Sequence, residues 1–175
     1  MTSGQWKGVI ILLMVLFISA AQAHDGTVSI SGTIQDNTCE LAPDSKNKTV
    51  NMGAVAGPQF RRVGDFSPAK PFTLSLENCG PAASEATVTF SGMADTQNPG
   101  LYALDAGADS ASGLALGIYD SKGQRIAPGE TSAGVVLKPG QASAMMDFSA
   151  RYVAVLDSVM VGSANVTVTF VVNYN

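Results

Sequence analysis

The feature that most constrains the fold is a series of short segments in which apolar and polar side chains alternate. Residues 71–77 place Phe72, Leu74 and Leu76 on one face, and residues 86–90 repeat the pattern. Alternation with a period of two is typical of a β-strand that buries one face. No window keeps a helical period of 3.6 over three turns, so we expect little helix.

Further segments of this kind follow along the chain, and Gly, Pro and Asn cluster between them. The other predicted strands are 49–52, 101–104, 114–119, 134–137, 144–148, 152–156 and 165–174. The turn-forming groups between strands are 56–58, 97–100, 121–124, 127–129 and 138–140. Short strands separated by such turns indicate an antiparallel β-sandwich, and the sequence contains no linker or repeat.

Both ends of the chain carry an alternating segment. Residues 27–35 lie ahead of the first cysteine, where a chain is usually loose unless something holds it. They place Val28, Ile30, Gly32 and Ile34 on one face. At the other end, one face of residues 165–174 carries Val166, Val168, Phe170, Val172 and Tyr174. The N-terminal strand can complete the sheet of its own chain or that of another chain.

The first residues have the pattern of a secretion signal. Lys7 precedes an apolar run at 9–18, and Ala21-Gln22-Ala23 fits the small-x-small cleavage rule. The alternative, an uncleaved membrane anchor, needs about 20 apolar residues. We therefore expect cleavage after Ala23 and a mature chain with no bilayer-spanning segment.

The predicted export of the chain indicates the oxidation state of its two cysteines. Cys39 and Cys79 are the only cysteines of the chain, and an even pair in an oxidising compartment predicts a disulfide. Closing a loop of about 40 residues contributes roughly 4 kcal/mol by the chain-entropy estimate. A zinc site would need closely spaced Cys and His residues, and a redox site would favour Cys-x-x-Cys.

Charge and histidine content exclude several function classes. Removing the signal leaves nine Lys and Arg against 14 Asp and Glu, a net charge of −5 with histidine neutral. This balance argues against nucleic acid and anionic membranes as partners. His24 is the only histidine, so neither a Ser-His-Asp nor a Cys-His site can form. We expect no enzyme, no cofactor and no metal site.

Several motifs stand out along the mature chain: the arm 24–37 running into Cys39, Glu77-Asn78-Cys79, residues 90–95 with 101–104, residues 112–118, Gly162 and the penultimate Tyr174. Together they resemble the subunits of type 1 fimbriae of the chaperone–usher class, most of all their minor adaptor subunits. The resemblance covers the whole mature chain.

The resemblance implies an all-β fold, an incomplete immunoglobulin-like sandwich (pilin fold) that lacks its last strand. Residues 1–23 would be the signal peptide, 24–36 a free donor-strand extension and 37–175 the pilin domain. A periplasmic chaperone would lend a strand to the open groove. At the outer-membrane usher the arm of the next subunit would replace it, which is donor-strand exchange.

The same resemblance assigns residue roles. Val28, Ile30, Gly32 and Ile34 would enter the neighbouring subunit. The groove and the chaperone-binding C-terminal strand would comprise Gly162, Val166, Val168, Phe170, Val172 and Tyr174. The implied function is that of a structural minor subunit on the bacterial surface, linking a tip adhesin to the shaft and supporting cell adhesion. The alternatives are a major shaft pilin, or a self-complete secreted sandwich with an enzymatic or binding role.

Overall fold

The computed structural model describes residues 29–34 and 36–175. The chain divides into two units, Met1–Thr33 and Ile34–Asn175. The predicted signal peptide and Val28 of the predicted donor face lie outside the described residues. In the first unit, residues 29–33 carry no helix or strand. Every described strand belongs to the second unit.

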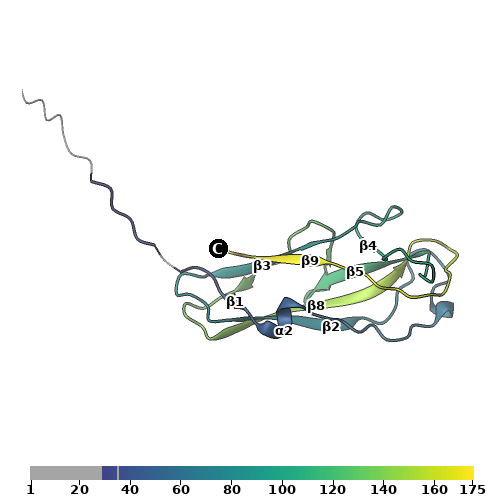
Figure 1. Ribbon diagram of the computed structural model, residues 1–175, viewed down its shortest axis with the longest axis horizontal. Coiled ribbons are helices and arrows are strands. Elements are labelled where there is room, and N and C mark those ends of the chain that lie inside the picture. Colours follow the sequence, from purple (N-terminus) through teal and green to yellow (C-terminus); the bar gives the residue numbers. More distant parts are fainter. Residues whose placement is uncertain (1–28, 35) are drawn as a thin grey trace, which may run out of the picture. The chain divides into compact units, whose positions relative to one another are not determined.

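The larger sheet of the second unit is built around one long strand. Its order is β1-β2-β8-β5-β4, with β6 paired to β5, and all pairs are antiparallel. The strands are β1 (Glu40–Leu41), β2 (Lys70–Glu77), β4 (Tyr102–Ala103), β5 (Leu114–Asp120), β6 (Arg125–Ile126) and β8 (Ser143–Ala154). In Figure 1, β8 runs between β2 and β5 through the middle of the domain.

The smaller sheet has the order β7-β3-β9 in the described part of the chain. Its strands are β7 (Val135–Val136), β3 (Glu85–Ser91) and β9 (Thr169–Tyr174). The C-terminal strand β9 lies along β3 (Figure 1) and pairs with no other described strand, so one of its edges is free. Helical structure among the described residues is limited to α2 (Pro43–Lys46) and the 3-10 turn η1 (Gly57–Gln59).

Aromatic side chains join the two sheets in the core. Phe90 of the smaller sheet lies 5.1 Å from Phe148 and 6.3 Å from Phe72 of the larger sheet, measured between ring centroids. Leu74 and Val88 are fully buried beside them. Because burying one such side chain is worth about 1.5–3 kcal/mol, this layer contributes several kcal/mol to stability.

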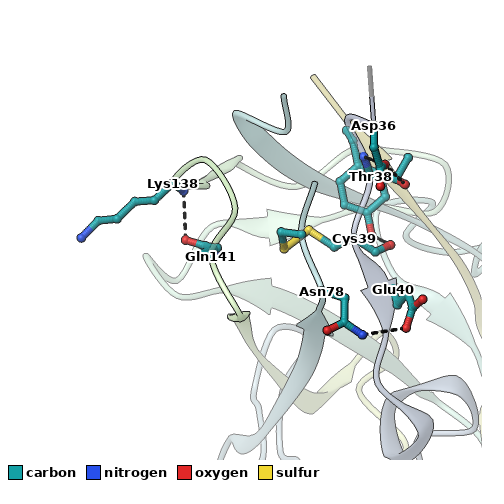
Figure 2. Close-up of a disulfide and its surroundings, with 9 residues drawn as sticks. Asp36, Thr38, Cys39, Glu40, Asn78, Lys138 and Gln141 are labelled. Carbon is teal, nitrogen blue, oxygen red and sulfur yellow. Dashed lines mark hydrogen bonds between the residues drawn. A yellow bond between two sulfur atoms is a disulfide. The ribbon is translucent and has the colours of Figure 1, made fainter. Parts of the chain in front are cut away.

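The predicted disulfide is confirmed. Cys39 and Cys79 are joined at an S–S distance of 2.07 Å, just before β1 and just after β2 (Figure 2). The chain ahead of β1 is also held by main-chain bonds: Gly80 N–H donates to Thr38 O (2.8 Å) and Ala82 N–H to Asp36 O (3.1 Å). A Cβ on Gly80 would lie 2.3 Å from Asp36 O, so this close approach requires glycine.

The predicted all-β character is confirmed, and several boundaries change. The predicted strands 144–148 and 152–156 are one strand, β8, because buried Ala150 and outward Arg151 continue the alternation between them. Residues 49–52 form no strand, because no described strand lies beside them. Residues 165–168 stay outside β9, because β3 ends at Ser91, opposite Thr169. Strands β1 and β6 were not predicted from the sequence, because each is too short to show alternation of apolar and polar residues.

Candidate functional site

A groove of about 1280 Å³ opens into the core of the second unit. One rim is residues 46–55. The other begins with residues 159–170, which line the groove, and β9 continues it to Tyr174; residues 159–174 are called the C-terminal rim. Its floor is apolar and comes from both sheets, with Leu74, Phe90, Leu116, Ile118 and Tyr152 among its residues. The volume exceeds the roughly 300–1,000 Å³ of typical small-molecule pockets.

The C-terminal rim continues the alternation predicted from the sequence. The inward side chains are half-buried, and the exposed ones between them are polar or, at Val171, apolar. The half-buried residues are Ala164, Val166, Val168, Phe170, Val172 and Tyr174. Phe170 packs on Phe90 with ring centroids 6.1 Å apart. These side chains pack against the core on one side, and on the other side those at 164–170 face the groove.

The main chain of this rim has free hydrogen-bonding groups. Asn175 N–H donates to Glu85 O (3.0 Å), and Glu85 N–H donates to Asn175 O (3.4 Å). In an antiparallel ladder such double-bonded pairs alternate, so Phe170, Val172 and Tyr174 point their N–H and C=O groups away from β3. With no second partner strand in the described structure, this edge is open to pairing.

The opposite rim also has no main-chain partner among the described residues. Residues 48–55 make no backbone–backbone hydrogen bond in the described structure, and Gly53 N–H is held only by the Asn51 side chain (2.9 Å). Val50, Met52 and Val55 are half-buried. The groove therefore separates two unpaired main chains above an apolar floor.

Hydrogen bonds from two tyrosine hydroxyls hold the two ends of the C-terminal rim in place. The Tyr152 hydroxyl donates to Ala164 O at one end. At the other end the Tyr174 hydroxyl donates to Cys39 O (3.0 Å), beside the disulfide. Burial raises the pKa of both phenols, so both keep their donor proton well above neutral pH.

Gly162 lies ahead of β9, in the connection that brings the chain to the groove. A Cβ there would lie 2.5 Å from Ala111 N and 2.6 Å from Asp109 O. The next residue is bonded to the same loop, since Ser163 N–H donates to Asp109 O (2.8 Å) and Ala111 N–H donates to Ser163 O (2.9 Å). Gly162 thus allows two backbones to meet at the start of the rim.

The described residues of the predicted donor segment are exposed. Ile30 is 93% and Ile34 101% exposed, and a Cβ on Gly32 would meet nothing within 4 Å. Large apolar side chains that are fully exposed on the same face of one segment are typical of an interaction site, because binding a partner would remove their surface from water. They are therefore candidate contact residues.

Some residues that line the groove were not predicted from the sequence to do so. Val55 and Ala164 line the groove but stand outside every predicted strand, and Tyr152 was predicted only as a strand residue. No cluster of metal-ligating side chains occurs among the residues that the structure describes. Within the same residues, no helix has the length and apolarity needed to cross a membrane.

Comparisons with known proteins agree on one family. A family model described as "Fimbrial protein" matches residues 28–175. The "Probable major fimbrial subunit LpfA" of Escherichia coli O157:H7 is 39% identical over 158 residues, covering 90% of this chain and 88% of that protein. A type I fimbria protein of Burkholderia pseudomallei has a structure with a TM-score of 0.60 and 32% identity, covering 79% of this chain and 90% of that one.

The P pilus rod subunit PapA has a similar structure. Its TM-score is 0.64 at 18% sequence identity, covering 78% of this chain and 99% of that one. At this identity the similarity concerns the fold alone.

Proposed function

The chain belongs to the fimbrial protein family, and from that premise we propose that it polymerises by placing its N-terminal arm in the open groove of a neighbouring subunit. Its fold is an incomplete immunoglobulin-like pilin sandwich with one disulfide. As a fimbrial subunit it is a structural protein of a surface fimbrium, associates with other subunits and is not an enzyme.

The observation that carries the proposal is the pair of unpaired main chains on either side of an apolar floor. A strand laid between residues 48–55 and the free edge of β9 would bond to main chain on both sides and place alternate side chains on the floor. Addition of a peptide strand to a sheet edge is a common mode of recognition, in which main-chain bonds give affinity and pockets for alternate residues give specificity.

The arm has the matching pattern. Val28, Ile30, Gly32 and Ile34 share one face, and the described isoleucines are exposed. Moving Ile30 and Ile34 from water into the groove would contribute about 1.5–3 kcal/mol each. Ordering the arm offsets part of this gain, so the main-chain bonds are also needed. Gly32 would lie where the groove has no room for a side chain.

Before assembly, an open apolar groove with a free strand edge favours aggregation. This supports the proposal that a periplasmic chaperone covers the groove with a strand of its own, and that the exchange for the next arm takes place at an outer-membrane usher. Residues 1–23 would direct export into the periplasm, residues 24–36 would be the donor strand, and residues 37–175 would form the domain that accepts a strand.

Within the fibre we propose the place of a minor adaptor between tip adhesin and shaft, supporting cell adhesion. The similarity to a probable major fimbrial subunit favours a second candidate, the repeating shaft subunit. The two differ in copy number: an adaptor occurs once or a few times per fibre, whereas a shaft subunit makes up most of its length. Quantitative mass spectrometry of purified fimbriae separates them.

The test of polymerisation is strand complementation. The purified chain is titrated with a peptide of residues 24–36, and its unfolding free energy is measured in urea. Binding at 100 times the dissociation constant would raise it by about 2.7 kcal/mol. The matched control is the same peptide with Ile30→Ser and Ile34→Ser, which should have little effect.

An adaptor would respond to arm peptides of other subunits more strongly than to its own. If neither its own arm nor any other fimbrial arm or chaperone stabilises the chain, the groove does not accept a strand.

A further inference from the structure

On the outer face of the larger sheet, the face turned away from the core, Arg151 lies between two aromatic rings. Its guanidinium carbon is 4.2 Å from the ring centroid of Tyr119 and 5.1 Å from that of Phe66. Gly117, the cross-strand partner of Arg151, makes room for this arrangement: a Cβ on it would lie 2.7 Å from the Tyr119 ring. The cation is therefore held in a fixed position by its neighbours.

Among the described residues, this guanidinium has no hydrogen-bond acceptor. In the described structure Arg151 Nε is buried without a partner, and no carboxylate lies within ion-pair distance of the side chain. A hollow of about 470 Å³ adjoins it, lined by Gln59, Phe66, Ser67, Pro68, Ala69 and Arg151. A rigid guanidinium beside a hollow and an exposed aromatic ring is suited to a carboxylate, which it can bind through two parallel bonds.

The opposite charge occurs at the other end of the same face. Glu40 and Glu77 are direct cross-strand partners in β1 and β2, and both are exposed. Like charges directly opposite each other weaken a strand pair. Asn78 donates one amide hydrogen bond to Glu40 (3.0 Å), while the Lys138 side chain extends away (Figure 2). No ion pair to either glutamate occurs among the described residues.

The strand register shows how far apart the two sites are. Glu77 pairs with Ser143, at the start of β8, and Arg151 stands eight residues further along that strand, about 27 Å away. The acid pair lies at the end where Tyr174 is bonded to Cys39, and Arg151 lies beside Tyr152, at the end where Tyr152 is bonded to Ala164. One chain cannot bring the two sites together.

We propose that this face mediates a head-to-tail contact between two copies of the chain, in which Glu40 and Glu77 of one copy bind Arg151 of the next. The contact rests on the second candidate of the proposed function, the repeating shaft subunit, since arm-to-groove assembly brings two copies of this chain end to end only when the subunit repeats. It is heterologous, so it repeats along a fibre instead of closing into a dimer. In a chain with excess negative charge, a positive group held in place selects one orientation of approach.

The test is zero-length cross-linking of assembled fimbriae from the Arg151→Lys variant. Lysine keeps the charge and supplies an amine that a carbodiimide joins to a carboxylate in direct contact. We expect linked peptides between position 151 and Glu40 or Glu77, and the separation of about 27 Å means that they come from different copies. Adding Glu40→Gln and Glu77→Gln should abolish the link. Fibres that cross-link elsewhere but not between these positions would overturn the proposal.

A second preparation separates this contact from polymerisation. The full chain with Arg151→Lys and Gly32→Arg, whose arm should no longer insert, is cross-linked at high concentration in low salt. The same link should form, and it should be lost in high salt because exposed ion pairs are screened. Failure of this variant to form fibres while the link is present is the expected result for both proposals, whereas fibres at the wild-type level would contradict arm insertion and leave the charge contact standing. Absence of the link in both preparations would contradict the charge contact.

Discussion

Gly162→Ala tests whether one close backbone contact organises the acceptor groove. The new Cβ would lie 2.5 Å from Ala111 N, 2.6 Å from Asp109 O and 2.7 Å from Ser110 C. All three atoms belong to main chain, which cannot rotate aside as a side chain can. The segment that leads into β9 must therefore move away from residues 109–111.

The expected loss of stability follows from the two main-chain hydrogen bonds of Ser163 that the substitution would disturb. Ser163 N–H to Asp109 O (2.8 Å) and Ala111 N–H to Ser163 O (2.9 Å) would be lost or stretched. Each is worth about 0.5–1.5 kcal/mol net, and a buried group left unpaired costs about 1–3 kcal/mol. We expect a loss of about 2–4 kcal/mol in the free energy of unfolding.

Urea unfolding of the purified chain measures this loss, which should lower the midpoint and leave the slope unchanged. The matched control is Gly32→Ala, whose added methyl group meets nothing within 4 Å, so it should unfold like the wild type. Complementation by the arm peptide should weaken only in Gly162→Ala, since its groove rim is displaced. A Gly162→Ala chain as stable as the control would refute the reasoning.

Three further predictions concern the core, the pH response and the arm. Phe90→Ala should cost about 3–5 kcal/mol in urea unfolding, because Phe90 joins both sheets and supports Phe170; a cost below 1 kcal/mol would contradict that role. Burial, aided by Glu130, raises the pKa of Tyr102 to about 12, so its stabilising contribution is complete below pH 10 and is lost between pH 10 and 12. That loss, about 3 kcal/mol, should be absent from Tyr102→Phe, which removes a hydroxyl that has no hydrogen-bond partner in the described structure; identical alkaline unfolding of both chains would argue against it. Gly32→Arg should leave unfolding unchanged and stop the arm from inserting into its neighbour, and SDS-resistant multimers at wild-type level would contradict the arm proposal.

Much of the fold could be predicted because strand burial is a local property. Alternation identified the buried faces of β2 and β3, and Leu74, Val88 and Phe90 are buried as expected. The disulfide followed from export and an even cysteine count. The inward face of the C-terminal segment was also predicted, since its side chains at 166–174 are half-buried in alternation.

Pairing was harder to predict, because it depends on residues distant in sequence. Residues 49–52 and β9 both alternate, yet β9 pairs with β3 while 49–52 pairs with no described strand. Val55 and Ala164 became groove residues only through the approach of two segments more than 100 residues apart. Nothing in the sequence near either residue indicates this.

The amino-acid sequence is sufficient to identify which side chains must leave water and which segments can be strands, because these depend on side-chain chemistry and a period of two. It also shows an N-terminal segment with apolar residues on one face. The folded structure was needed to show that two main chains have no described partner across an apolar floor, and that Gly117 leaves room for the Tyr119 ring beside Arg151. Those outcomes depend on strand order and register, which are set by packing between distant residues and by the space that each neighbour leaves.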